Sequence, residues 1–317
     1  MGESSHAAET QAAGIAVVLA TRNRPVAAEL AAASVLSSLY RCFELLVVDQ
    51  STNDATSRAL ASLAGDRRLT VLRSATLGLA RARNLGVVAT KAPIVAFTDD
   101  DCEVAPGWLD AIVSALAADS RIGVVFGDVH AVDYDRTAGF VPAYRVKQTF
   151  TARGLRDKAR IEGIGACMAV RRATWEALEG FDELFGAGAP YRSGEDSDFT
   201  MRALLKGHWA HETAAAVVRH SGFRPWHEGP ALIDGYMLGL GAANTKMLRL
   251  GGLAALKPIG DLAWRWLADE PVVDLNHRPP RLRRLGAFLS GAWLAWREPL
   301  NRSSGRFLRP EALKELG

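Results

Sequence analysis

Short apolar runs alternate with helical stretches over the first 126 residues of the chain. The runs have the length of strands, and most of them are apolar at nearly every position, which is typical of parallel strands covered by helices on both faces. This rhythm predicts an α/β protein with a layered sheet and right-handed crossovers. We expect strands at 15–20, 44–48, 69–72, 94–97 and 122–126, and helices at 26–40, 55–64, 78–90 and 106–118.

The pattern changes twice after that. A strand at 165–170, helices at 172–179 and 196–207 and a strand at 209–218 follow an irregular stretch. From about residue 230 the chain is helical, rich in Leu, Ala and Trp, with clusters of Arg and no strand signal. We therefore predict a disordered tail over 1–13, a domain over 14–230 whose halves meet at 126/127, and a helical C-terminal extension over 231–317.

Bulk composition excludes several classes of protein. A net charge of +3 over 317 residues does not indicate the basic face of a nucleic-acid binder. Three widely spaced cysteines argue against a disulfide framework or a zinc site and favour a reducing compartment. The first residues lack a basic targeting segment, and no apolar run is long enough to span a bilayer. We expect a cytoplasmic protein, free or peripheral on the inner face of the membrane.

Polar residues follow three of the predicted strands. Thr21, Asp49 and Thr98 begin these segments, and in open α/β sheets the carboxyl ends of the strands form the ligand-binding edge. The third segment contains three consecutive aspartates, Asp99, Asp100 and Asp101, which repel one another unless a cation neutralises them. A divalent ion such as Mg²⁺ or Mn²⁺ binds carboxylate and phosphate oxygens together. The alternative is a solvated acidic turn that caps the helix near Trp108.

The motifs resemble those of a known family. Residues 14 to about 222 resemble the catalytic domain of family 2 inverting glycosyltransferases, which have the GT-A fold: a Rossmann-like, mostly parallel mixed sheet flanked by helices. The resemblance implies a donor half over 14–126 and an acceptor half over 127–230. It rests on six segments in the family's order, at 20–25, 47–54, 78–86, 97–101, 180–183 and 194–198.

The resemblance implies roles on the donor side. Asp99 and Asp101 match the family's DxD pair, in which the last aspartate binds the metal and the first lies towards the ribose; Asp100 is the least defined of the three. A histidine after a strand completes the metal shell in several such enzymes, and His220 stands at that place, although a hydrogen-bonded histidine of the cleft is an equal alternative. Further donor contacts are implied for Thr21, Asn23, Asp49, Gln50 and Arg83, of which the last reaches a phosphate.

The acceptor side is implied by the Glu195-Asp196 motif. Inversion needs a base that takes the acceptor's proton, and Asp196 matches the family's base, with Glu195 as the competing residue. Gly165 is expected to let the chain approach the donor sugar or acceptor closely. Asp182 belongs to a segment that we interpret as mainly architectural, with a place near the acceptor as the alternative.

The C-terminal extension lies outside the resemblance. Tryptophans beside arginines and apolar helix faces fit a segment on an anionic membrane, which would suit a lipid-linked acceptor. Packing on the catalytic domain or a homodimer contact is the alternative interpretation. The sequence thus predicts a Mn²⁺- or Mg²⁺-dependent inverting transfer of sugar from a nucleotide diphosphate sugar to a hydroxyl. The alternatives are a nucleotidyltransferase, or a binding protein that keeps the fold without turnover.

Overall fold

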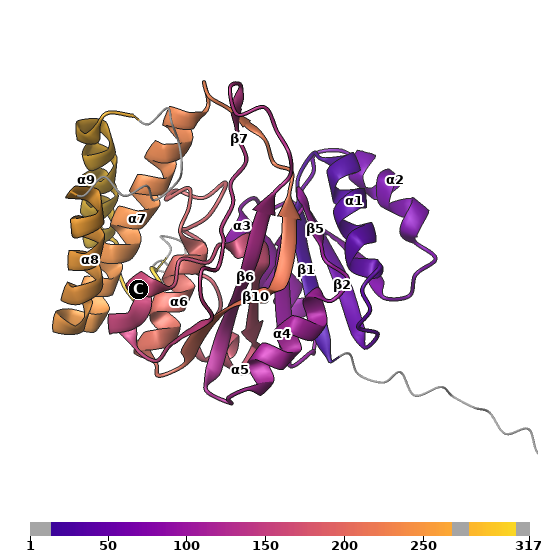
Figure 1. The fold of residues 1–317 in the computed structure, drawn as a ribbon, viewed down its shortest axis with the longest axis horizontal. Helices are drawn as coiled ribbons and strands as arrows, with labels where there is room; N and C mark the ends of the chain where they lie inside the picture. Colours follow the sequence, from indigo (N-terminus) through magenta and orange to yellow (C-terminus); the bar gives the residue numbers. More distant parts are fainter. Residues whose placement is uncertain (1–13, 268–278, 309–317) are drawn as a thin grey trace, which may run out of the picture.

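A mixed β-sheet forms the centre of the molecule (Figure 1). The computed structural model describes residues 14–267 and 279–308, so the predicted tail at 1–13 lies outside the described residues. Within these ranges nine strands form the main sheet, in the order β3-β2-β1-β4-β9-β6-β10-β5 with β8 on β10, and β7 pairs with β11 apart from it. The strands are β1 (Ile15–Thr21), β2 (Phe43–Asp49), β3 (Leu69–Arg73), β4 (Ile94–Asp99), β5 (Cys102–Val104), β6 (Ile122–Ala131), β7 (Gly139–Phe140), β8 (Phe150–Ala152), β9 (Met168–Arg171), β10 (Trp209–His220) and β11 (Arg224–Pro225).

The directions of the strands confirm the expected mostly parallel, mixed sheet. β3, β2, β1 and β4 run parallel, β9 runs antiparallel between β4 and β6, and β10 is parallel to β6. Strand β5 was not predicted, because it is only three residues long and directly follows the aspartates. It pairs antiparallel with the end of β10, which sets Cys102 opposite His220.

The helices follow the predicted order with shorter bounds. The helix expected at 26–40 ends at Leu36, and the one expected at 55–64 divides into an α-helix and a 3₁₀ turn. The α-helices are α1 (Pro25–Leu36), α2 (Ala55–Leu60), α3 (Leu79–Ala89), α4 (Trp108–Ala117), α5 (Arg172–Ala177), α6 (Glu195–Leu205), α7 (Gly229–Gly251), α8 (Leu256–Leu267) and α9 (Arg281–Arg297), and the 3₁₀ turns are η1 (Ala61–Leu63), η2 (Leu155–Arg160), η3 (Gly165–Cys167) and η4 (Gly252–Ala255).

Both faces of the sheet are covered, as the continuous apolar strands require. Ile15, Val17 and Leu19 of β1 pack in one core with residues of α1 and α4. Val18 of β1 points to the other face and packs in a second core with residues of α3 and α6. These two cores hold the strands in place and thereby position the residues at the strand ends.

The C-terminal extension packs on the domain as a layer of helices, in which α7 is the inner element and α8 and α9 lie outside it (Figure 1). Helices α7 and α9 run parallel, since Arg283 pairs with Asp234 near one end and Arg249 donates to the Ala295 carbonyl near the other. The two backbones are in direct contact: a Cβ on Gly291 would lie 1.9 Å from the Leu238 carbonyl oxygen. Glycine therefore sets the distance between these helices.

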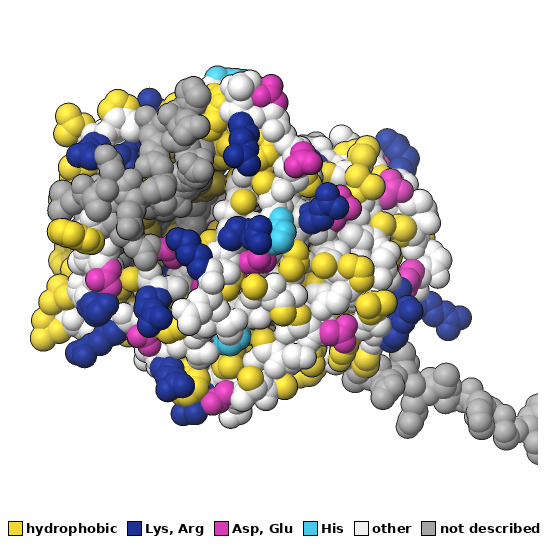
Figure 2. All heavy atoms as spheres, in the orientation of Figure 1, with side chains coloured by type: hydrophobic (Ala, Val, Ile, Leu, Met, Phe, Trp, Pro, Cys, Tyr) yellow, Lys and Arg dark blue, Asp and Glu magenta, His cyan; other side chains and the backbone are white. Residues whose placement is uncertain are grey.

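Charged side chains of both signs are interspersed on the face shown in Figure 2, which agrees with the small net charge. No helix among the described residues has the length and apolar composition to cross a bilayer.

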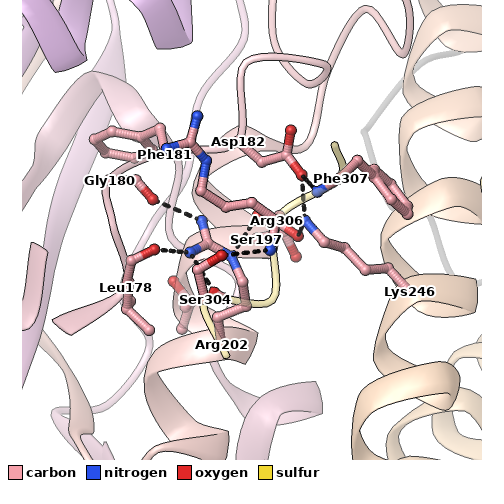
Figure 3. Close-up of polar contacts among 12 residues, drawn as sticks. Leu178, Gly180, Phe181, Asp182, Ser197, Arg202, Lys246, Ser304, Arg306 and Phe307 are labelled. Atoms are coloured by element: carbon pink, nitrogen blue, oxygen red, sulfur yellow. Dashed lines mark hydrogen bonds and ion pairs between the residues drawn. The ribbon is translucent and has the colours of Figure 1, made fainter. Parts of the chain in front are cut away.

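A buried charge cluster joins the extension to the domain (Figure 3). Lys246 of α7 is fully buried, and its ammonium donates to Asp182 at 2.5 Å and to Asp198 of α6 at 2.7 Å. Arg202 donates to the other oxygen of Asp198 at 2.8 Å and to the carbonyls of Leu178, Gly180 and Ser304. Two cations thus meet two carboxylates away from water, and Arg202 also bonds to backbone carbonyls.

The last described segment completes this cluster. The backbone N–H of Phe307 donates to Asp182 at 2.7 Å, and the Phe307 ring lies 4.6 Å from the Lys246 ammonium. The cluster therefore fastens α6 to α7 and to the segment after α9, so the extension is part of the same packed unit.

Gly291→Ala should weaken the contact between α7 and α9. The added methyl would meet the Leu238 carbonyl, so we expect overpacking of about 1–3 kcal/mol and a melting temperature lower by roughly 2–6 °C in thermal unfolding. Gly286→Ala on the same helix is the matched control, because nothing lies within 4 Å of its Cβ and alanine favours the helix. An equal rise in melting temperature for both variants would contradict the close packing.

Lys246→Met should destabilise the protein strongly, because it leaves two buried carboxylates without their cation. We expect a loss of about 3–5 kcal/mol and a fall in melting temperature of roughly 5–10 °C. Lys257→Met is the control on the neighbouring helix, since Lys257 pairs with Asp261 while its side chain is 57% exposed, and its loss should cost little. Equal melting temperatures for the two variants would contradict a stabilising role for the cluster.

Candidate active site

The ends of three parallel strands bring polar residues to one edge of the sheet. Thr21 of β1 stands opposite Asp49 of β2, and Asp99 of β4 stands opposite Ala20 of β1. His220 ends β10 and lies beside the turn after β4, because β5 reverses the chain there. This arrangement confirms that the predicted polar segments converge.

The second and third aspartates of the triplet are buried and bonded. Asp100 accepts hydrogen bonds from Thr21 at 2.8 Å and from Arg24 at 2.9 Å. The same Arg24 guanidinium reaches Asp101 at 3.0 Å, and Arg224 approaches Asp101 from another segment at 3.4 Å. The triplet is therefore not a solvated turn, and Gly107 rather than an aspartate precedes helix α4. Part of its negative charge is balanced by arginines of the chain itself.

The pKa values of the two carboxyls are shifted in opposite directions. Burial raises the pKa of Asp100 above its usual value, against the charge of Arg24 and the Thr21 hydrogen bond. Burial acts on Asp101 in the same direction, yet the hydrogen bond and charge of His220, together with Arg24 and Arg224, hold the pKa of Asp101 well below its usual range. Asp101 is thus the more strongly anionic group of the pair.

The donor set around Asp101 fits a divalent cation. Ligand atoms of Asp101, Cys102 and His220 lie within 4.8 Å of one another, with His220 Nε2 3.1 Å from Asp101 Oδ1. Among the described residues, the buried His220 Nδ1 has no hydrogen-bond partner. Burial raises the pKa of Cys102 well above its usual value, so its sulfur stays a neutral thiol. A carboxylate oxygen suits Mn²⁺ or Mg²⁺, and imidazole is a common metal ligand that can add to it. Asp99 is not one of these three residues.

The residues expected to bind the nucleobase are held by neighbouring segments. Asp49 is fully buried and accepts from Arg73 at 2.9 Å and from the Ser51 N–H. The Gln50 amide donates to the carbonyls of Thr76 and Gly78 at 2.5 and 3.2 Å. Asn23 has a left-handed backbone, and its side-chain oxygen accepts from the Thr52 N–H at 3.0 Å. These bonds fix the loops after β1 and β2 together.

Arg83 lies at the centre of the site with its side chain 2% exposed. Its guanidinium binds Asp99 at 3.2 Å, Glu195 at 3.0 Å and the Gly165 carbonyl at 3.1 Å. A Cβ on Gly165 would lie 2.6 Å from this guanidinium, so the group that approaches Gly165 closely is Arg83. The phosphate contact expected of Arg83 stays a prediction.

The N-terminus of α6 carries the acidic pair opposite the aspartate triplet. Gly194 precedes the helix with φ of +83°, and Glu195 is buried against Arg83. Burial and the neighbouring charge of Asp196 raise the pKa of Glu195 to about 7, although Arg83 opposes the shift. Asp196 is half-buried, and its two oxygens accept from the N–H groups of Gly165 and Ser197 at 2.8 and 2.6 Å. It is the carboxylate of the pair that solvent reaches.

Asp182 lies apart from these groups. It is 1% exposed and belongs to the charge cluster with Lys246 (Figure 3). This position agrees with the architectural interpretation of its segment. The carboxyl is too deeply buried for an acceptor to reach it.

Several residues of the site were missed from the sequence. Burial raises the pKa of Tyr236 on α7 to about 12, against the charge of Arg224, and the charges of Glu195 and Asp196 raise it further. Arg24, Arg73 and Arg224 pair with the site's carboxylates. Of these arginines, only Arg73 could have been predicted from the sequence, because parallel pairing of β2 and β3 sets it opposite Asp49.

The amino-acid sequence is similar to those of known glycosyltransferases. The model of the family described as glycosyl transferase family 2 matches residues 16–178. The human protein polypeptide N-acetylgalactosaminyltransferase 15 is 33% identical over 118 residues, a match that covers 35% of this chain and 18% of that protein. The chain thus spans less than a fifth of the length of this relative.

Solved structures show the same fold. S. aureus TarS 1-349 aligns with a TM-score of 0.63 at 18% identity, covering 88% of this chain and 80% of that one. The mannosyltransferase PcManGT from Pyrobaculum calidifontis, in complex with GDP-Man and Mn²⁺, aligns with a TM-score of 0.62 at 20% identity, covering 93% and 78%. These alignments confirm the GT-A fold with its helical C-terminal region. Together with the family match over more than half of its length, they show that the chain belongs to glycosyl transferase family 2.

Proposed function

We propose that the protein transfers a sugar from a nucleotide diphosphate sugar to an acceptor hydroxyl, with inversion and with the aid of Mn²⁺ or Mg²⁺. The observation that carries the proposal is the pair of carboxylate groups that face one another across Arg83. One is the aspartate triplet at the end of β4, whose Asp99 binds Arg83, and the other is the Glu195-Asp196 pair at the start of α6, whose Glu195 binds Arg83. Such a site can hold a donor on one side and remove a proton from an acceptor on the other.

The donor would bind to the loops that follow β1, β2 and β4. Asp49 and Gln50 lie at the place for the base, with Thr21 and Asn23 beside them, and Asp99 and Asp100 lie towards the ribose and the phosphates. Asp101 and His220 would hold the cation, which neutralises the charge of the departing diphosphate. Structures of TarS with UDP-GlcNAc and of PcManGT with GDP-Man support a nucleotide sugar as the donor class.

The acceptor side would use Asp196 as the general base. The N–H groups of Gly165 and Ser197 hold its carboxylate, and partial exposure lets a hydroxyl reach it. As the acceptor oxygen bonds to the anomeric carbon, the bond from that carbon to the phosphate oxygen breaks, and the acceptor's proton passes to Asp196. Glu195 would position Arg83 instead, because its carboxyl is buried against the guanidinium.

Asp196→Asn should lower turnover by about 10²–10⁴-fold, because the amide cannot take the acceptor's proton. Binding of UDP or GDP with Mn²⁺, measured by calorimetry, should persist. Glu195→Gln is the matched variant and should retain much more turnover. The opposite order of the two losses would make Glu195 the base, and unchanged turnover in both would remove the pair from the reaction.

Asp101→Ala should weaken Mn²⁺-dependent binding of UDP or GDP by at least ~10-fold, since it removes the anionic ligand of the cation site. The measurement is the nucleotide affinity with and without Mn²⁺. Asp110→Ala, which changes an exposed aspartate at the start of α4, should leave both affinities unchanged. A Mn²⁺-dependent affinity in Asp101→Ala equal to that of the unaltered protein would contradict the ligand role.

A further inference from the structure

Helix α9 exposes a row of large apolar side chains. Leu282, Leu289, Trp293 and Trp296 are 82%, 55%, 60% and 58% exposed, and Leu285 between them is 40% exposed. Their spacings of three and four residues place all five on one face of the helix. The row runs from Leu282 to Trp296, fifteen residues of helix that span about 21 Å. Single exposed leucines are ordinary in proteins, whereas a continuous row of this kind marks an interaction surface.

The opposite face of α9 is fully used by packing. Gly291 and Ala295 are buried against the extension, and Gly291 touches the backbone of α7. The exposed row is therefore not the side by which α9 joins its own chain. One face of α9 thus packs on the rest of the chain, and a second face is left apolar and open to solvent.

Helix α8 adds to the same outer side of the molecule. Leu256 and Trp264 are 53% and 71% exposed, and Leu253 in the turn before the helix is 84% exposed. Figure 1 places α8 and α9 outside α7, away from the sheet, and hydrophobic side chains protrude along that margin in Figure 2. Tryptophan has an apolar body and a polar N–H, which suits the boundary between lipid and water.

Arginines flank the row. Helix α9 carries four arginines and no carboxylate. Arg297 lies on one side of the row and Arg281 on the other, and the Arg297 guanidinium lies 4.9 Å from the centre of the Trp293 ring. Arg283 lies on the same side as Arg297 but is paired with Asp234 of α7. Apolar residues between basic ones are the pattern of a helix that lies flat on an anionic bilayer, with cations at the phosphate level.

The charges select the membrane over a second copy. Two α9 helices pairing antiparallel through the row would bring Arg297 of each against the basic end of the other, with no acidic residue in either helix to balance them. Glu298, which directly follows the helix, is half-buried and lies near Arg249 of α7. A bilayer that contains anionic lipid supplies both the apolar layer and the negative charge. We propose that the exposed row of α9, with the apolar residues of α8, docks the protein on an anionic membrane surface. The proposal is independent of the reaction assigned to the site.

The test is flotation of the full chain with vesicles of phosphatidylcholine alone and with 30% phosphatidylglycerol. We expect binding to the anionic vesicles. Leu289→Gln/Trp293→Gln/Trp296→Gln should reduce it at least tenfold. Leu30→Gln/Leu39→Gln/Val88→Gln removes three equally exposed apolar side chains outside the extension and should bind as the unaltered chain does. Melting temperatures of both triple variants check that they fold.

The charge and the competing occupant are tested separately. Arg281→Gln/Arg297→Gln should weaken anionic binding by about fivefold for each arginine, and less in high salt. Equal binding to neutral vesicles, or no effect of the α9 triple variant, would overturn the proposal. Light scattering in lipid-free solution examines the second copy: a dimer that the α9 triple variant converts to monomer would assign the row to self-association and overturn docking on lipid.

Discussion

The buried guanidinium of Arg83 is the contact on which the arrangement of the site depends. It lies between Asp99 at the end of β4 and Glu195 at the start of α6, and it also binds the Gly165 carbonyl. A buried cation must have its donors satisfied, so these three segments can approach it only in one geometry. The proposed donor side and the proposed base are therefore held at a fixed separation by a residue that solvent barely reaches.

Helix α6 is held at two levels. Arg83 binds Glu195 in its first turn, and Lys246 binds Asp198 three residues later from the side of the extension. Asp196 lies between these two contacts. The family match ends at residue 178, yet the groups that fix α6 come from both sides of that boundary. The extension therefore contributes to the placement of Asp196, and its outer helices present the apolar row to solvent.

The sequence predicted the parts of this structure that local pattern determines. Apolar runs located the longer strands but not the short strands β5, β7, β8 and β11. The rule that parallel strands end at one edge brought Thr21, Asp49 and Asp99 together. It could not predict what pairs across the chain. Arg24, Arg224 and Lys246 look like surface cations in the sequence, and only the fold brings them to buried carboxylates. Gly165 was expected to admit a ligand, whereas a side chain 82 residues away in the sequence occupies that space.

The most direct test of this account is a crystal structure of the protein with Mn²⁺ and a nucleotide diphosphate, UDP or GDP. The account predicts a cation bound by Asp101 and His220 and a nucleotide along the loops after β1 and β2. Arg83 should still lie between Asp99 and Glu195, with Asp196 open to the space beyond the diphosphate. A cation bound elsewhere, or an Arg83 that leaves both carboxylates for the phosphates, would contradict it.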